Sequence, residues 1–85
     1  MKRDEIQTEI VKILEESFEF ENPGLDDNLR DVHGFDSIDA IELLGEIEKM
    51  LGFAISREEK QQAMEIRTIN DILDFIESLI AERNK

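Results

Sequence analysis

The run Gly34-Phe35-Asp36-Ser37-Ile38-Asp39-Ala40-Ile41-Glu42-Leu43-Leu44 combines the start of a helix with a hydroxyl group that the helix start does not need. Asp36 followed by Asp39 predicts an N-cap and an acid three residues later, a short-side-chain variant of the capping box. We therefore expect Ser37 to be the first helical residue, with its hydroxyl directed to solvent. A hydroxyl at this position lies where backbone N–H groups and the helix dipole favour a phosphate.

Beyond Ser37, the pattern predicts a helix that continues to about Leu51 and ends at Gly52, a plausible C-cap. Ile38 and Ile41 fall at the edge of its apolar arc, beside the serine, and are equally consistent with core packing and with partner contact. The arc itself is expected to face the core and holds Ala40, Leu43, Leu44, Ile47, Met50 and Leu51.

Three further segments carry helix signals. Residues from about Asp4 to Phe18 have apolar side chains at spacings of three and four. Ser56 and Glu59 form a capping box that begins a short helix, and Thr68 and Asp71 begin the last one. In the last helix, the residues expected to form the buried row are Ile69, Ile72, Leu73, Ile76 and Ile80, with Phe75 and Leu79 flanking it.

Between the first helix and Phe35, turn-forming residues predict a long loop. Its apolar residues are expected to hold it to the core; they are Phe20, Leu25, Leu29 and Val32. No stretch alternates as a strand would. The sequence therefore predicts an all-α fold: a four-helix bundle with a long loop between helices 1 and 2 and a short third helix, in one domain spanning residues 1–85.

Charge and composition exclude several functions. The chain has 22 acidic and 10 basic residues and a net charge of −12, which repels nucleic acid and favours basic protein surfaces. Without cysteine it has no disulfide and no cysteine-based zinc site. No segment approaches the ~20 apolar residues of a membrane span, and the start of the chain lacks the apolar core of a signal peptide. We expect a soluble, cytoplasmic monomer.

The sequence resembles the acyl carrier proteins, whose attachment motif is usually Asp-Ser-Leu followed by an acid. The resemblance covers almost the whole chain. Ile38 replaces the usual leucine of the motif, and the matching residues are Gly34, Asp36, Ser37, Asp39, Glu42, Leu43 and Glu48. It implies that a separate phosphopantetheinyl transferase (holo-carrier synthase) joins 4'-phosphopantetheine from coenzyme A to Ser37. The thiol of this arm would hold acyl groups as thioesters. No catalytic residue and no enzyme activity are expected, since nothing near Ser37 in sequence could activate it.

The resemblance also implies a docking face for acyl-transferring, condensing and reducing enzymes with basic patches. This face would comprise Asp36, Ile38, Asp39, Ile41, Glu42, Glu46 and Glu48. A solvated helix face is the alternative, although Glu42 and Glu46 form a like-charge i,i+4 pair that costs a few tenths of a kcal/mol. Gly45 and Lys49 depart from the housekeeping pattern and favour a specialised carrier. Fatty-acid, polyketide and other lipid pathways all remain open.

Two other functions remain as alternatives. A peptidyl or aminoacyl carrier would use the same arm, but its usual paired glycines are absent before Ser37. An unmodified acidic helical adaptor would bind basic partners through charge alone.

Other polar and apolar residues have less specific interpretations. His33 is interpreted as a solvated or partly packed side chain, with a titrating role beside the arm as the alternative. Asp26, Asp27 and Asp31 do not have EF-hand spacing, so we interpret them as turn residues and expect no metal. If cargo folds inward between the helices, candidate lining residues are Leu44, Ile47, Met64 and Ile72.

Overall fold

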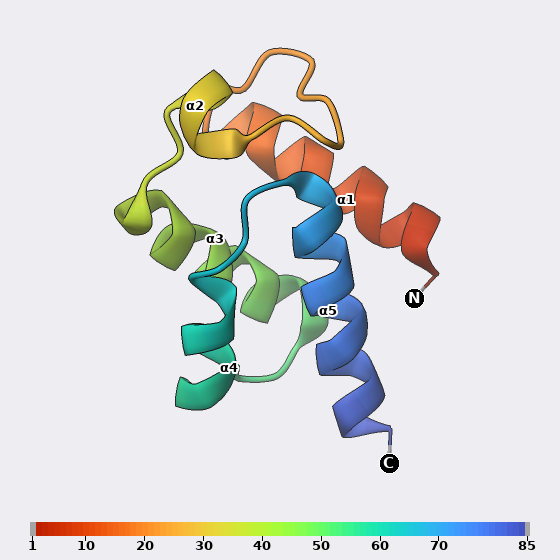
Figure 1. Cartoon of the computed structure of the whole chain (residues 1–85). Helices are drawn as coiled ribbons and strands as arrows, with labels where there is room; N and C mark the ends of the chain where they lie inside the picture. Colours follow the sequence, from red (N-terminus) through yellow and green to blue (C-terminus); the bar gives the residue numbers. More distant parts are fainter. Residues whose placement is uncertain (1, 85) are drawn as a thin grey trace.

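The computed structural model describes residues 2–84, and over this range the chain forms five α-helices and no strand, which confirms the all-α prediction. The helices are α1 (Arg3–Ser17), α2 (Leu29–His33), α3 (Ser37–Leu51), α4 (Arg57–Ala63) and α5 (Ile69–Arg83). Figure 1 shows that the long connection after α1 leads into α2 at one end of the bundle, close to where α3 begins.

Reciprocal capping boxes begin three of the helices, at the positions that the sequence predicts. In α3, Asp39 N donates to Asp36 Oδ1 at 3.0 Å and Asp36 N donates to Asp39 Oδ2 at 3.2 Å. Ser56 with Glu59 and Thr68 with Asp71 make the same exchange at the starts of α4 and α5. Because each box satisfies two backbone N–H groups, the first turns of these helices are fixed locally.

The core lies mainly between α1, α3 and α5. Each of these helices turns one apolar face inward, as the 3.6-residue periodicity predicts. The fully or nearly fully buried side chains are Ile6, Ile10 and Leu14 of α1, Leu43, Leu44 and Ile47 of α3, and Ile69, Ile72, Leu73, Ile76 and Leu79 of α5. The prediction that Ile80 belongs to the buried row while Phe75 and Leu79 only flank it is wrong: Phe75 and Leu79 are buried and Ile80 is only partly buried. Because α5 packs against both α1 and α4, its buried face is wider than a single row.

The structure differs from the sequence prediction in the long loop, which contains the five-residue helix α2. The side chain of Asn28 caps α2 by accepting hydrogen bonds from Arg30 N and Asp31 N. Gly34 ends α2 in the left-handed conformation with φ +67°, which glycine adopts without a Cβ penalty. A helix of five residues is shorter than two turns and shows no apolar periodicity, so the sequence pattern predicts a loop here.

Three of the four residues expected to hold this connection do so: Phe20 and Leu29 are buried, and Leu25 packs against the core. Val32 was predicted to join them, and this is wrong, because its side chain is 59% exposed. A single-turn helix at the edge of the bundle has little contact area, and Leu29 is its one buried residue.

Two arginines join neighbouring helices through ion pairs. Arg3, at the start of α1, pairs with Asp74 and Glu77 of α5. Arg83, at the end of α5, makes a two-pronged ion pair with Glu59 of α4 at 2.6 and 2.9 Å. Its guanidinium also donates to Ala54 O at 2.9 Å and lies 4.4 Å from the centre of the Phe53 ring. Arg83 therefore joins α5 to α4 and to the α3–α4 connection.

Candidate functional site

Ser37 is the first residue of α3, and its side chain is exposed, as the sequence predicts. Asp36 caps the helix instead, so the Ser37 hydroxyl makes no hydrogen bond to any residue that the structure describes. A hydroxyl with no structural duty at an exposed helix start can be esterified without loss of a helix-stabilising interaction.

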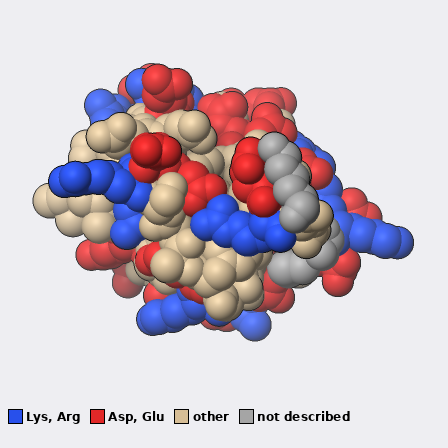
Figure 2. Space-filling model, turned by 90° about the horizontal axis from the view of Figure 1, so that it is seen from below, with Lys and Arg blue, Asp and Glu red and all other residues tan. Residues whose placement is uncertain are grey.

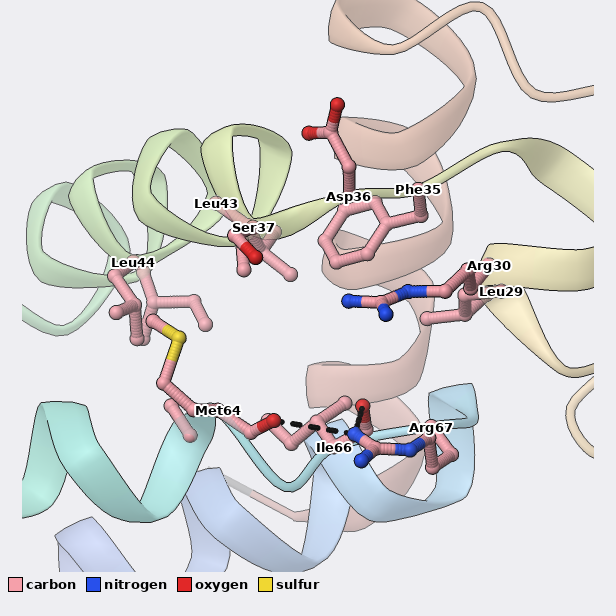
Figure 3. Close-up of a pocket in the computed structure, with 13 residues that line it drawn as sticks. Leu29, Arg30, Phe35, Asp36, Ser37, Leu43, Leu44, Met64, Ile66 and Arg67 are labelled. Carbon is pink, nitrogen blue, oxygen red and sulfur yellow. Dashed lines mark hydrogen bonds between the residues drawn. The ribbon is translucent and has the colours of Figure 1, made fainter.

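A small apolar cavity opens beside Ser37 (Figure 3). Its free volume is about 40 Å³, room for only a few waters at the ~10–15 Å³ that each requires. Leu44, Ile47 and Met64 line it as expected, whereas Ile72 lies in the core and is not part of its wall. The other lining residues are Leu29, Arg30, Phe35, Asp36, Ser37, Ala40, Leu43, Ala63, Ile66 and Arg67.

Backbone hydrogen bonds hold three segments around this cavity. Leu29 N, in α2, donates to Arg67 O in the α4–α5 connection at 2.8 Å. Phe35 N, two residues before Ser37, donates to Leu29 O at 3.0 Å. Because α2 bonds to both neighbours, the position of Ser37 is tied to that of the α4–α5 connection.

An aromatic cluster supports the approach to Ser37. Phe35 packs edge-to-face on Phe18 and Phe20, with ring centres 5.8 and 6.1 Å apart. His33 stacks on Phe20 with ring centres 4.5 Å apart, and its side chain is 11% exposed. His33 is therefore partly packed, as the first of its two interpretations states, and lies on α2 rather than in a loop.

His33 also contacts the turn that precedes α2. Its Nε2 lies 3.3 Å from Asp27 Oδ2, and the same oxygen accepts a 2.8 Å hydrogen bond from Gly24 N. The Gly24 hydrogen bond, with a further contribution from His33, lowers the pKa of Asp27. Asp26 accepts a hydrogen bond from the Asn70 side chain at 2.6 Å. Both aspartates are thus occupied in fixing the connection.

The outer side of α3 carries two large apolar side chains that the core does not use. Ile38 is 67% exposed and Ile41 is 63% exposed. The core interpretation of these two residues is therefore excluded, and they form an apolar strip beside Ser37. Such exposed aliphatic side chains near charged groups are typical of a protein-binding surface.

The five acids of the predicted docking face differ in their exposure and in the contacts that they make. Asp36 and Glu42 are exposed, and Asp39 is half-buried within the capping box. Glu46 pairs with Lys49 at 3.4 Å, and Glu48 accepts a 2.8 Å hydrogen bond from Ile55 N. Glu48 therefore fixes the α3–α4 connection with one oxygen, a structural role that the sequence prediction did not include. All five remain predicted partner-binding residues.

Elsewhere on the surface, acidic and basic side chains mix. Figure 2, which views the molecule from below Figure 1, shows blue Lys and Arg groups projecting among red Asp and Glu groups. The net charge of −12 is therefore not a uniform acidic coat.

Sequence reasoning missed Arg30 and Arg67, which are exposed and line the cavity with Ser37. They are 37 positions apart in the sequence, and no local pattern indicates that they converge. Within residues 2–84 there is no group of three or more His, Cys, Asp or Glu side chains that could hold a metal ion. Over the same range, no helix has the length and apolar character needed to cross a membrane.

Comparison with known proteins identifies the family. Residues 4–76 match the family model described as the phosphopantetheine attachment site. The acyl carrier protein of Coprothermobacter proteolyticus is 34% identical over 80 residues, which are 92% of this chain and 94% of that relative. The fold and the family match define the class of protein, a helical carrier of phosphopantetheine that is not an enzyme. Within this class, the chain belongs to the acyl carrier protein family.

Proposed function

We propose that Ser37 is the residue that bears the 4'-phosphopantetheine arm, and that the arm holds acyl intermediates as thioesters for biosynthetic enzymes. The observation that carries this assignment is that Asp36 caps α3 and leaves the Ser37 hydroxyl without a structural hydrogen bond. A phosphopantetheinyl transferase can reach this exposed oxygen, and the chain has no cysteine of its own to compete with the thiol of the arm.

Intact mass after co-expression with a broad-specificity phosphopantetheinyl transferase tests this assignment. Wild type and Ser78→Ala, which removes an exposed hydroxyl from α5, should gain the mass of the arm. Ser37→Ala should gain none, while it keeps the helix content of wild type because the capping box remains. If wild type stays unmodified, the unmodified acidic adaptor becomes the better account.

The outer side of α3 is the surface that we propose partner enzymes dock on. Its apolar strip, Ile38 and Ile41, lies next to exposed acids that basic patches would neutralise. Glu42→Lys should therefore lower kcat/KM for the transferase and for acyl-transferring or condensing enzymes, and the loss should shrink at high salt. Glu15→Lys makes the same charge change on α1 and should have little effect. Equal losses in both variants would show only a net-charge effect.

The pathway is proposed to be a specialised branch of fatty-acid, polyketide or related lipid synthesis in the cytoplasm. Gly45 and Lys49 change the surface of α3, and Lys49 neutralises Glu46 through their 3.4 Å contact. Mass analysis of the thioester on protein isolated from its native cell would identify the cargo. An aminoacyl thioester would favour the peptidyl carrier alternative instead.

A further inference from the structure

Two arginines border the cavity opposite the start of α3. Arg30 lies on α2, and Arg67 lies in the connection between α4 and α5. Figure 3 shows the Arg30 guanidinium directed into the space between α3 and the Met64–Arg67 segment, with the Arg67 guanidinium nearby. Two cations thus share one cavity mouth in a chain whose net charge is −12.

The guanidinium groups of these two arginines have no carboxylate partner among residues 2–84, although the chain contains 22 acids. Arg57 and Lys60 also lack an ion pair in this range, so the cavity arginines are distinguished by lining the cavity with Ser37. Arg67 donates from Nη1 to the carbonyl oxygens of Met64 and Ile66, at 3.1 and 3.0 Å. The other N–H groups of its guanidinium have no acceptor in the described part of the chain, whereas its backbone N–H donates to Asp71 Oδ2 at 2.9 Å. Both guanidinium groups are therefore available to an anion.

Backbone hydrogen bonds fix where the backbones of Arg30 and Arg67 lie relative to Ser37. The 2.8 Å bond from Leu29 N to Arg67 O places Arg67 beside the residue that precedes Arg30. The bond from Phe35 N to Leu29 O connects the same point to the chain just before Ser37. Arg67 is further restrained by its two carbonyl contacts. These bonds fix the backbone positions of the two arginines, whereas the Arg30 side chain is exposed and would be ordered by the bound anion.

Esterification of Ser37 would create a need for such cations. A phosphodiester at Ser37 adds a negative charge next to Asp36 and Asp39, which are committed to the capping box. Like charges this close repel each other, although the helix dipole offsets part of the repulsion. Figure 3 shows the Asp36 carboxylate directed away from the arginines, so it does not neutralise them.

We propose that Arg30 and Arg67 form an anion site that holds the phosphodiester of the arm at the mouth of the cavity. The inference rests on the proposed modification of Ser37. A carboxylate on the cargo would be a second source of the same chemistry. The position of the site favours the phosphodiester, because this group is bonded directly to Ser37 at the mouth, whereas the cavity wall behind it is apolar, with Leu44 and Ile47.

NMR of the modified protein tests this site. The Nε–Hε resonances of Arg30 and Arg67 should shift between the unmodified and the modified wild type, while those of Arg57 stay in place. Phosphorus relaxation should show a restricted phosphodiester in wild type and a freer one in Arg30→Gln/Arg67→Gln. The matched control is Arg57→Gln/Lys60→Gln, which removes two exposed charges from α4 that do not line the cavity. It should behave as wild type.

Thermal melting gives a second readout. We compare the change in melting temperature that attachment of the arm causes in each variant. In Arg30→Gln/Arg67→Gln this change should be more destabilising than in wild type, because the new charge is no longer compensated. The α4 control should preserve the wild-type effect. Unmoved Arg30 and Arg67 resonances, or identical phosphorus relaxation in wild type and the cavity variant, would overturn the proposal. Resonances that move only with a malonyl thioester and not with an acetyl one would also overturn it, in favour of a cargo site.

Titration of the unmodified protein with inorganic phosphate separates this inference from the proposed function. If phosphate shifts the Arg30 and Arg67 resonances of wild type and leaves the Arg57 resonance in place, the two cavity arginines form an anion site whether or not the arm is attached. If wild type accepts no arm, the proposed function fails and the assignment of the phosphodiester fails with it. If the arm is attached but the arginines respond to neither anion, only the present inference fails.

Discussion

Arginines serve two different purposes in this molecule. Arg3 and Arg83 fasten α5 to its neighbours through ion pairs with Asp74, Glu77 and Glu59. Near Ser37, the guanidinium groups of Arg30 and Arg67 line the cavity and have no carboxylate partner among the described residues. The ion-paired arginines join helices, and the cavity arginines keep their guanidinium groups available. Binding regions commonly belong to the less stable part of a fold for this reason.

The largest expected effect compares two isoleucines, one from each environment. Ile76, on α5, is fully buried, and Ile41, on α3, is 63% exposed. Ile76→Ala should lower the free energy of unfolding by about 3 kcal/mol, because it leaves a cavity in the core. Ile41→Ala should change it by less than about 0.5 kcal/mol while weakening enzyme docking. Urea unfolding of the unmodified protein measures both, and equal losses would show that the apolar strip on α3 is structural.

A smaller effect is expected at the Glu59–Arg83 pair. Hydrogen bonding to Arg83, with a further backbone hydrogen bond from Ser56, lowers the pKa of Glu59 from 4.5 to about 2. A carboxyl group with a lowered folded-state pKa stabilises the fold above its unfolded pKa. This contribution is therefore present above pH 4.5 and is lost as the pH falls through 2.

Glu59→Gln should accordingly lower the free energy of unfolding at pH 7 by about 1–2 kcal/mol, and the difference from wild type should vanish toward pH 2. Arg30→Gln, at the other end of the molecule, should change stability by no more than about 0.5 kcal/mol. Thermal melts from pH 2 to 7 provide the measurement. A difference between Glu59→Gln and wild type that does not depend on pH would mean that the ion pair is not its source.

The smallest effect is expected at Gly45, in the middle of α3. A Cβ placed at this residue would meet no atom within 4 Å apart from its own helix and chain neighbours. Gly45→Ala should therefore raise the free energy of unfolding by about 0.5–1 kcal/mol through backbone entropy alone. Gly34→Ala is the contrasting variant, because φ is +67° there and a Cβ would strain the backbone. Calorimetry that finds Gly45→Ala neutral or destabilising would contradict this account.

Sequence reasoning succeeded where the signal is local. Asp36, Ser56 and Thr68, each followed by an acid three residues later, marked three helix starts. The apolar spacing marked the inner faces of α1 and α3 and most of that of α5. It failed at α2, because a single turn shows no periodicity and only Asn28 and Gly34 indicated its ends.

The same distinction between local and long-range features applies to the candidate site. The exposure of Ser37 and the position of Ile38 and Ile41 at the edge of the apolar arc follow from one continuous helix and were predicted. Whether the two isoleucines are buried was left open, and only the structure shows that they are exposed. The cavity and its two arginines join segments far apart in the chain. The ion pairs of Arg3 and Arg83 likewise depend on tertiary packing, and the 2.8 Å bond that Glu48 accepts from Ile55 depends on how the chain turns after α3. Such contacts have no sequence signature.

The use of Asp36 as the cap of α3 has a kinetic consequence. If Ser37 were the capping residue, each attachment or removal of a group at its oxygen would break a helix-stabilising hydrogen bond, and the first turn would have to reorganise before a transferase could act. Because Asp39 N bonds to Asp36 instead, attachment of the proposed arm at Ser37 leaves this capping hydrogen bond intact. We therefore expect no reorganisation of the first turn between the bare and the modified protein.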